Sequence, residues 1–378
     1  MTSIIADNIT SPLGWTTSQN MQALYQETSG LTFHYSDRLN LKHHSAIIKS
    51  SELNALWVQY DNGTSYTKLE QLSIHSISDA LGQTQLDIAQ KDVLFVFATV
   101  KGNIELLDRR KETAVPFSRR YLFDTALAVS EYFKNPNPPI VISNACISGV
   151  LAIITGKRIL ESQSYKHVVV VGCDVISDFT LSGFNALKAM SLEMCKPFDK
   201  DRKGINLGEA CGTIILSSEL NGTDISLKGG SVSNDANHMS GPSRTGEGMY
   251  QVINNSIKDI DLPIDYISAH GTGTLFNDDM ESIAISRHNL TETPTNSLKG
   301  YWGHTLGAAG IIESIATYHS ILDKKLILSK GCEEKGTVQE INIIQETTSK
   351  SINCALKIAA GFGGCNASII FKKASNGS

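Results

Sequence analysis

Two segments of this 378-residue chain are apolar along their whole length, and they restrict its possible folds more than any other feature. Residues 93–98 and 168–171 contain no alternation of apolar and polar side chains. A strand that is apolar on both faces must be covered on both, as in parallel sheets packed between helices. Helical spacing of apolar residues occurs at 65–82 and 118–134. The chain is therefore predicted to be an α/β protein with helices outside and between its sheets.

The second half of the sequence repeats this alternation. It predicts helices near 248–258, 278–288 and 305–322, and strands at 264–267 and 367–371. A polar, glycine-containing stretch around 220–230 is taken as the midpoint, whereas residues 1–60 show the least regular pattern. We expect two similar halves, residues 1–220 and 221–378, packed as one body because no linker-like segment separates them.

Composition excludes several classes of protein. The net charge is −5 and the pI is near 6.1, which argues against a general nucleic-acid binder. Seven cysteines without a CxxC pair or zinc-like spacing indicate a reducing compartment, no disulfide framework and no structural metal. The N-terminus has no signal-peptide pattern, and no apolar run approaches the ~20 residues of a membrane span. The protein is therefore expected to be cytoplasmic, without a membrane span.

Cys146 occupies the most suggestive position in the first half. A short apolar run at 139–142 predicts a strand, and the apolar spacing after Cys146 predicts a helix ending near Arg158. Cysteine at the start of a helix can be a nucleophile with a lowered pKa, because the helix dipole favours the thiolate. Acyl-transfer enzymes also present nucleophiles on sharp strand-turn-helix connections. The alternative is a small, buried, unreactive side chain.

Three glycine-framed segments in the second half carry residues capable of chemistry. They contain His270, His304 and Phe362, and Lys299 precedes the second of them. Glycine lets the backbone approach a ligand closely, which suits a binding site. Each residue alone has a simpler interpretation: the histidines as turn residues, Lys299 as a surface lysine and Phe362 as a core side chain.

The combination of these segments is more specific than any one of them. The chain resembles the elongating β-ketoacyl-acyl carrier protein synthases, condensing enzymes of the thiolase superfamily. The resemblance runs from Ser11 to Phe371, and the matching segments come in the family's order. The matching segments are the Cys146 turn, Pro197-Phe-Asp199 with Arg202-Lys-Gly204 and Gly208-Glu209, His270-Gly-Thr-Gly-Thr274 with Asp278 and Glu281, Lys299 with Gly303-His304, Gly307-Ala-Ala-Gly310 and Glu313, and Gly361-Phe-Gly-Gly364 with Asn366.

The resemblance implies a thiolase-like fold: two duplicated βαβαβαββ halves in a five-layer αβαβα arrangement. The N-terminal half would carry the nucleophile Cys146, and the C-terminal half His270 and His304. Such enzymes are usually homodimers, and the subunits here would meet along the strand that leads to Cys146. A heterodimer with a second ketosynthase-like subunit is the alternative.

The resemblance also implies an acyltransferase reaction, a decarboxylative Claisen condensation. Cys146 would take an acyl chain from an acyl carrier protein and condense it with malonyl-acyl carrier protein, giving a β-ketoacyl product in fatty acid or polyketide/polyene biosynthesis. His270 and His304 would stabilise the enolate. No cofactor or metal would belong to the enzyme, because the phosphopantetheine arm arrives on the carrier protein. The resemblance assigns further roles to a charged support (Lys299, Glu313), an oxyanion and gate segment (Phe362, Gly363, with the Cys146 N–H), and arm-binding threonines (Thr272, Thr274).

Carrier proteins are acidic, so a basic entrance is expected. The candidates cluster beside Pro197-Phe-Asp199: Lys196, Lys200, Arg202 and Lys203. The alternative is a solvated loop whose arginine pairs internally with an aspartate.

Residues also discriminate among related functions. Initiating synthases pair the cysteine with His and Asn, and thiolases place a second cysteine before the C-terminal glycines, whereas Cys365 follows them. The short loop before Pro197 looks more like that of polyketide ketosynthases than of housekeeping enzymes. The remaining alternative is a non-catalytic partner subunit similar to chain-length factors, although these lack the active cysteine. A cysteine hydrolase would need an orienting His-Asp or His-Asn pair that nothing here demands.

Overall fold

The structure is a computed structural model that describes residues 2–108, 110, 112–219 and 224–374. Ten strands form a continuous sheet in the order β11-β10-β14-β15-β9-β1-β8-β6-β4-β5. Among the described residues, the two five-stranded parts are joined by β1 and β9, which pair through Thr2 with Leu227 and Ser3 with Ser226. The predicted boundary between residues 220 and 221 lies outside the described residues, and the division into two halves there stays a prediction.

Each part of the sheet has the same topology. In the first, β4, β5 and β6 are parallel to one another, and β8 and β1 complete the part with antiparallel pairing. In the second, β10, β11 and β14 are parallel, with β15 and β9 antiparallel. The bounds of these strands are β1 Thr2–Thr10, β4 Val93–Ala98, β5 Ile140–Ile142, β6 His167–Asp174, β8 Ala210–Ser217, β9 Ile225–Asn234, β10 Tyr266–Ser268, β11 Thr295–Asn296, β14 Cys354–Gly361 and β15 Cys365–Lys373.

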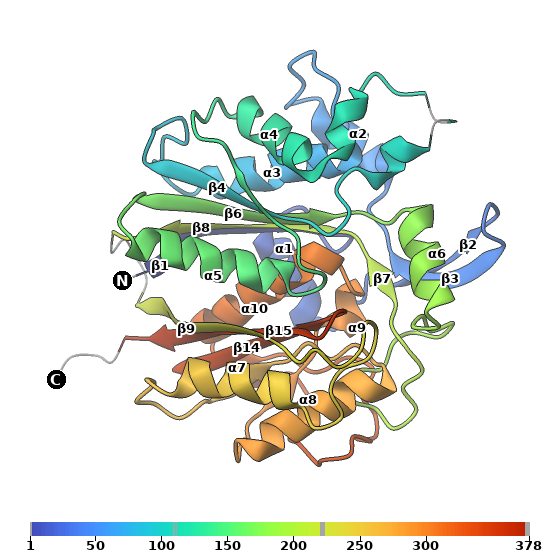
Figure 1. The fold of residues 1–378 in the computed structure, drawn as a ribbon, viewed down its shortest axis with the longest axis vertical. Helices are drawn as coiled ribbons and strands as arrows, with labels where there is room; N and C mark the ends of the chain where they lie inside the picture. Colours follow the sequence, from blue (N-terminus) through green and yellow to red (C-terminus); the bar gives the residue numbers. More distant parts are fainter. Residues whose placement is uncertain (1, 109, 111, 220–223, 375–378) are drawn as a thin grey trace.

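Helices fill the space between and outside the two parts of the sheet (Figure 1). α5 (Ser148–Glu161) and α10 (Ala309–Asp323) lie between them. α3 (Lys68–Leu81) and α4 (Leu122–Tyr132) cover one outer face, and α7 (Glu247–Ile257) and α8 (Leu275–Arg287) cover the other. The predicted five-layer thiolase-like arrangement is confirmed, including the duplication of its halves.

Apolar side chains explain this layering. The strand residues of β4 and β6 are buried throughout, so they require a helix layer on each face. α3 begins with a capping box, in which Thr67 accepts from the Glu70 N–H and the Glu70 carboxylate accepts from the Thr67 N–H. No helix in the described ranges is long and apolar enough to cross a membrane.

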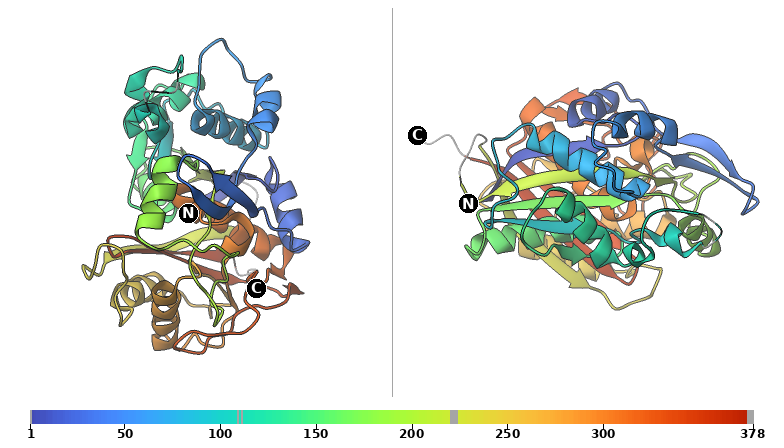
Figure 2. Two further views of the ribbon diagram at one scale, coloured as in Figure 1. Left: turned by 90° about the vertical axis from the view of Figure 1, so that its right-hand side faces the viewer. Right: turned by 90° about the horizontal axis from the view of Figure 1, so that it is seen from above.

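The remaining elements are shorter and lie outside the ten-stranded sheet. A hairpin of β2 (Thr32–Ser36) and β3 (Leu41–Ala46) extends from the body, and β3 pairs with β7 (Leu207–Gly208) (Figures 1 and 2). The other elements are α1 (Thr17–Tyr25), α2 (Ser50–Trp57), α6 (Asp178–Ala186), α9 (Lys299–Trp302), β12 (Lys325–Leu326), β13 (Thr348–Ser349) and three short 3-10 turns at Ile104–Leu107, Phe117–Arg120 and Leu306–Ala308.

The structure refines two expectations from the sequence. Residues 1–60, expected to be the least regular part, begin with β1, which runs through the centre of the sheet and is buried along nearly its whole length. The glycine-containing stretch near residue 230, taken as the midpoint of the chain, includes the start of β9, whose Gly229 and Gly230 have positive φ. Polar and glycine residues obscured both strands because tertiary pairing outweighs local propensity.

Candidate active site

Cys146 lies on a tight turn between β5 and α5, as predicted. Ala145 has φ of 45°, an uncommon value for a residue with a Cβ. The Ser148 hydroxyl stabilises the turn, since it donates to the Ala145 carbonyl at 2.6 Å and accepts from the Asn144 N–H at 2.8 Å. The cysteine thus stands directly before Ile147, the N-cap residue of α5.

The expected lowering of the Cys146 pKa is wrong. The thiol is only 7% exposed, and burial raises its pKa to about 11. Lys299 and the Phe362 N–H oppose this effect by favouring the thiolate, but they do not outweigh desolvation. The thiol is therefore neutral at pH 7, and it must lose its proton to act as a nucleophile.

Close packing of α5 against α10 brings Cys146 and His304 together. A Cβ on Gly149 would lie 2.8 Å from the Gly307 carbonyl oxygen and from the Ile311 nitrogen. A Cβ on Gly310 would lie 2.5 Å from the Val150 nitrogen. Only glycines allow the two helix starts to approach this closely, which explains the small residues that follow each catalytic candidate.

His270 lies on the loop between β10 and α8. The Glu281 carboxylate accepts the N–H groups of His270 and Gly271, both at 2.7 Å. Asp278 accepts those of Thr272 at 2.9 Å and Gly273 at 3.1 Å. Two buried carboxylates at the start of α8 thereby fix the loop that positions the imidazole.

Lys299 and Glu313 lie directly behind His270. The Lys299 ammonium donates to the His270 carbonyl at 2.7 Å and to Glu313 Oε1 at 2.6 Å, and it lies 3.3 Å from His270 Nδ1. Because an ammonium only donates, Nδ1 is assigned as the acceptor and Nε2 carries the ring proton. The charged support expected from the resemblance is thus in contact with the histidine.

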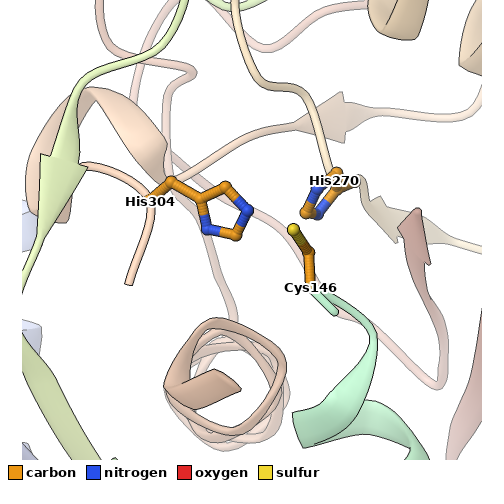
Figure 3. A group of neighbouring side chains, drawn as sticks. All are labelled: Cys146, His270 and His304. Carbon is orange, nitrogen blue, oxygen red and sulfur yellow. The ribbon is translucent and has the colours of Figure 1, made fainter. Parts of the chain in front are cut away.

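His304 has the same tautomer for a different reason. Its Nδ1 accepts the backbone N–H of Leu306 at 3.1 Å, so Nε2 again carries the proton. This Nε2 is buried and has no hydrogen-bond partner among the described residues. The ring is 1% exposed and turns toward the thiol (Figure 3).

The three side chains therefore form one compact group. The Cys146 Sγ and a ring nitrogen of each histidine lie within 4.8 Å of one another, and the two imidazole rings meet edge to face with centroids 5.1 Å apart. Burial, followed by the charge of Lys299, lowers the pKa of both histidines well below the usual value. Both imidazoles are neutral at pH 7 and present N–H donors to a common point.

Cysteine and histidine are also common zinc ligands, and Cys146, His270 and His304 lie close enough together to hold a metal ion. A zinc ligand needs the lone pair of a neutral imidazole nitrogen. Here the partners of Nδ1 in both rings place the proton on Nε2, the nitrogen that His304 turns toward the sulfur. The arrangement is therefore better suited to binding an oxyanion than a metal ion.

The glycine loop 361–364 passes close to the thiol. A Cβ on Gly361 would lie 3.1 Å from the Cys146 nitrogen, and the Phe362 N–H is directed at the thiol. Gly363 has φ of 85° and donates its N–H to the Met239 carbonyl at 2.8 Å. The Phe362 ring stacks at a tilt on Phe184, 5.6 Å between centroids. The N–H groups of Cys146 and Phe362 are thus close neighbours, whereas that of Gly363 is occupied.

A pocket of about 520 Å³ leads from the surface to the reactive group. Cys146, His270, His304 and Phe362 lie in its wall, and so do the arm-binding candidates Thr272 and Thr274, whose hydroxyls share a hydrogen bond of 2.8 Å. Phe276 at the pocket is 70% exposed. The pocket is of the size that accommodates a small-molecule chain rather than a macromolecule.

The predicted carrier-docking residues differ in their surroundings. Arg202 is buried and donates to Asp279 at 2.7 Å, to Gly336 and to Asp199, so its assignment to a docking surface was wrong and the internal pairing was the better interpretation. Lys200 and Lys203 are exposed and pair with Glu334 and Glu193 respectively. Lys196 is half-buried.

Sequence reasoning missed two buried charged residues of this region. Asp174, at the end of β6, accepts the N–H of Gly307 at 2.7 Å and the Thr99 hydroxyl at 2.8 Å, and so connects the two halves beside the thiol. Lys357 lies within β14 and is fully buried. A charged residue in or at the end of an otherwise apolar strand was the available signal for both.

Comparisons with known proteins agree with this geometry. Residues 69–221 match the family model "Beta-ketoacyl synthase, N-terminal domain", and residues 225–330 match "Beta-ketoacyl synthase, C-terminal domain". The chain is 26% identical to 3-oxoacyl-[acyl-carrier-protein] synthase 2 of Vibrio harveyi over 96% of both chains. It is 28% identical to a putative polyketide beta-ketoacyl synthase 1 of Streptomyces halstedii, over 73% of this chain and 70% of that protein.

A solved structure shows the same fold. It is the ketosynthase ApeO in complex with its chain length factor ApeC from Xenorhabdus doucetiae, with a TM-score of 0.85 and 24% identity. The similarity covers 99% of this chain and 98% of the matched chain.

Proposed function

This chain belongs to the β-ketoacyl synthase family, and on that premise we propose that it condenses an acyl chain held on Cys146 with malonyl-acyl carrier protein. The observation that carries the proposal is the convergence of the Cys146 Sγ and a ring nitrogen of each histidine within 4.8 Å, in the wall of a pocket open to the surface. Covalent capture by the thiol and stabilisation of an oxyanion by the donors are what such a condensation requires.

In the first stage the acyl chain moves from the phosphopantetheine thiol to Cys146. The cysteine sulfur bonds to the thioester carbonyl carbon, the bond to the arm sulfur breaks, and the cysteine proton is taken up by the departing arm. The developing oxyanion is stabilised by the N–H groups of Cys146 and Phe362. With a pKa of about 11, only about one thiol in ten thousand is ionised at pH 7, so proton loss is coupled to attack.

In the second stage malonyl-acyl carrier protein brings a thioester carbonyl to the two imidazoles. The carbon–carbon bond to the carboxylate breaks, carbon dioxide leaves, and the electron pair forms an enolate whose oxygen accepts both Nε2–H bonds. The enolate carbon then attacks the acyl thioester on Cys146 and expels the cysteine sulfur as a thiolate, which takes a proton from solvent and returns to the neutral thiol. The product is a β-ketoacyl chain, two carbons longer, on the carrier protein.

The pocket supplies the path for the arm. Thr272 and Thr274 line this pocket together with the reactive group, and their hydroxyls can bond the amides of phosphopantetheine. Lys203 and Lys188 line the same pocket and are exposed, so they suit the arm's phosphate and an acidic carrier surface. Lys196 and Lys200, which precede Lys203 in the sequence, are kept as further docking candidates in this proposal. The enzyme itself needs no further cofactor in this scheme.

The chain forms a dimer through β5 in this proposal. β5 is one of the two edge strands of the ten-stranded sheet, β11 being the other, and Ile140 on β5 is 36% exposed. An unpaired edge strand next to the nucleophile suits antiparallel pairing with a second subunit. That subunit is a second copy, or a chain-length-factor-like partner as in the Xenorhabdus complex.

A non-catalytic partner role for this chain itself is disfavoured by its intact site. Cys146, His270 and His304 are all present and converge, which a purely structural subunit does not require. The acyl chain length and the pathway, fatty acid or polyketide/polyene, depend on the donor that the enzyme accepts.

The proposal is tested by intact-mass analysis after incubation with a panel of acyl-carrier proteins. An acyl adduct on the wild type that is absent from Cys146→Ala supports it, and the donor that reacts fastest identifies the preferred chain. If no donor forms an adduct, either alone or after addition of a candidate partner subunit, the catalytic proposal is rejected in favour of the partner-subunit role.

A further inference from the structure

A second buried lysine lies behind the catalytic histidine. Lys357 Nζ is 2.7 Å from Glu313 Oε2, and Lys299 Nζ is 2.6 Å from Glu313 Oε1. Lys299 and Lys357 are 0% exposed and Glu313 is 3% exposed. One carboxylate therefore bridges two ammonium groups in the protein interior.

The same two ammonium groups cap three consecutive backbone carbonyls. Lys357 Nζ donates to the carbonyls of Ser268 at 3.3 Å and Ala269 at 3.1 Å, and Lys299 Nζ donates to that of His270 at 2.7 Å. The parallel pairing of β14 with β10 places Lys357 opposite Ser268, which explains how the side chain reaches this end of β10.

Burial of these three charged groups is unfavourable for the free energy of folding if they serve stability alone. Each buried ion loses several kcal/mol of hydration free energy, and a well-packed apolar side chain at the same place is often as stable or more so. The neighbours of Lys357 on β14 (Leu356 and Ile358) are themselves apolar and fully buried. A lysine here therefore points to a role in the site rather than in the core.

We propose that Lys357 is a positioning residue, whose ammonium acts as a built-in monovalent cation beneath the loop of His270. Two carbonyls and one carboxylate form an all-oxygen set around it, the kind of environment that also suits a free ammonium or potassium ion. By holding Oε2 of Glu313, it keeps Oε1 in place for Lys299. Lys299 in turn fixes the tautomer and orientation of His270.

The charges of Lys299, Lys357 and Glu313 explain what removal of Lys357 would change. The three groups carry one net positive charge, and without Lys357 the Glu313 carboxylate interacts with Lys299 alone. Lys299 can then move toward Glu313 and away from His270 Nδ1, which is already its most distant contact at 3.3 Å. A displacement of about 1 Å in a catalytic group can cost about 10²-fold in rate.

The inference rests on the proposed function, and its test separates the two stages of the reaction. Lys357→Ala and Lys357→Gln are compared with the wild type for Cys146 acylation and for malonyl-carrier protein decarboxylation. Lys372→Met, which removes a half-buried lysine of the neighbouring strand β15 that pairs with Asp261, is the control. We expect decarboxylation to fall by about 10²-fold in both Lys357 variants, while acylation changes by less than about threefold.

Chemical rescue supplies the specific readout. Ammonium or potassium chloride is expected to restore most of the decarboxylation rate in Lys357→Ala, but not to accelerate the wild type, with sodium chloride as the ionic-strength control. The same salts are expected to raise the thermal midpoint of Lys357→Ala selectively, because a ligand that binds only the folded state stabilises it.

Several results would overturn the inference. They are unchanged decarboxylation in a folded Lys357 variant, an equal loss in both stages, or no selective effect of ammonium and potassium on either rate or melting. If Lys357→Ala does not fold, Lys357→Gln decides, because full activity without the charge contradicts the proposal. Failure of the wild type to condense would reject the proposed function, whereas the melting measurement would still decide the role of Lys357.

Discussion

Replacement of His304 gives a prediction whose size follows from the structure. Its Nε2–H is buried, has no partner in the described part of the chain, and faces the position expected for the enolate oxygen. His304→Leu removes this donor with little change in volume. Loss of one oxyanion donor typically costs about 10²–10³ in rate, or about 2.7–4 kcal/mol. We therefore expect decarboxylation of malonyl-carrier protein to fall by that factor.

The substitution also has a predictable effect on stability. It leaves the Leu306 N–H without its acceptor, the His304 Nδ1, at a cost of about 1–3 kcal/mol in the free energy of unfolding. Acylation of Cys146 uses backbone donors and should change by less than about fivefold. The loss of rate is thus expected to be confined to the second stage.

Single-turnover assays of the two stages, with thermal melting of each variant, test this prediction. His304→Gln is the matched control, since its amide keeps an N–H donor and should lose no more than about tenfold in decarboxylation. Wild-type decarboxylation by His304→Leu, or equal losses in the Leu and Gln variants, would refute the assignment of Nε2–H as an oxyanion donor.

Three other predictions concern protonation and packing. Iodoacetamide should alkylate Cys146 about tenfold faster for each pH unit between pH 7 and 9. Lys299→Met should slow the alkylation, because this lysine lowers the thiol pKa. An alkylation rate that reaches a plateau below pH 8 would contradict the raised pKa. Gly149→Ala should lower the free energy of unfolding by about 1–3 kcal/mol in denaturant titrations, because its Cβ would meet backbone atoms at 2.8 Å; wild-type stability would contradict the close helix packing. Burial lowers the pKa of His319, but its ion pair with Asp7 outweighs burial and raises the pKa above the usual value. The contribution of this ion pair to stability should therefore be complete below about pH 6.5 and disappear as the pH rises through the folded-state pKa. The difference in melting temperature between wild type and His319→Gln should then be larger at pH 6 than at pH 9. A difference independent of pH would contradict the ion pair.

Much of the fold could be predicted because its signals are local. The uninterrupted apolar strands β4 and β6 required a layer on each face, and the small residues after Cys146 and His304 agreed with two closely packed helix starts. β9 could not be predicted in this way, because glycine and polar residues form a strand there only through pairing with β15. The repeated strand order also became evident only in three dimensions.

The same distinction between local signals and tertiary contacts applies to the residues of the site. Cys146, His270 and His304 follow from motif and resemblance, since the two histidines each adjoin a glycine and Cys146 stands on a turn between a strand and a helix. The direction of the thiol pKa did not follow, because desolvation depends on the surrounding side chains and exceeds the effect of the helix terminus. Arg202 and Lys357 were misjudged or missed for a related reason: their partners, Asp279 and Glu313, are distant in sequence.

The central claim is that one active site couples decarboxylation to acyl transfer through Cys146. It is tested most directly by supplying acyl- and malonyl-carrier proteins together and measuring carbon dioxide and the β-ketoacyl product in the same reaction. We expect one carbon dioxide for each elongated chain in the wild type and no elongated product with Cys146→Ala. Elongated product from Cys146→Ala at the wild-type rate, or a wild type that retains its acyl adduct and never extends it, would contradict this mechanism.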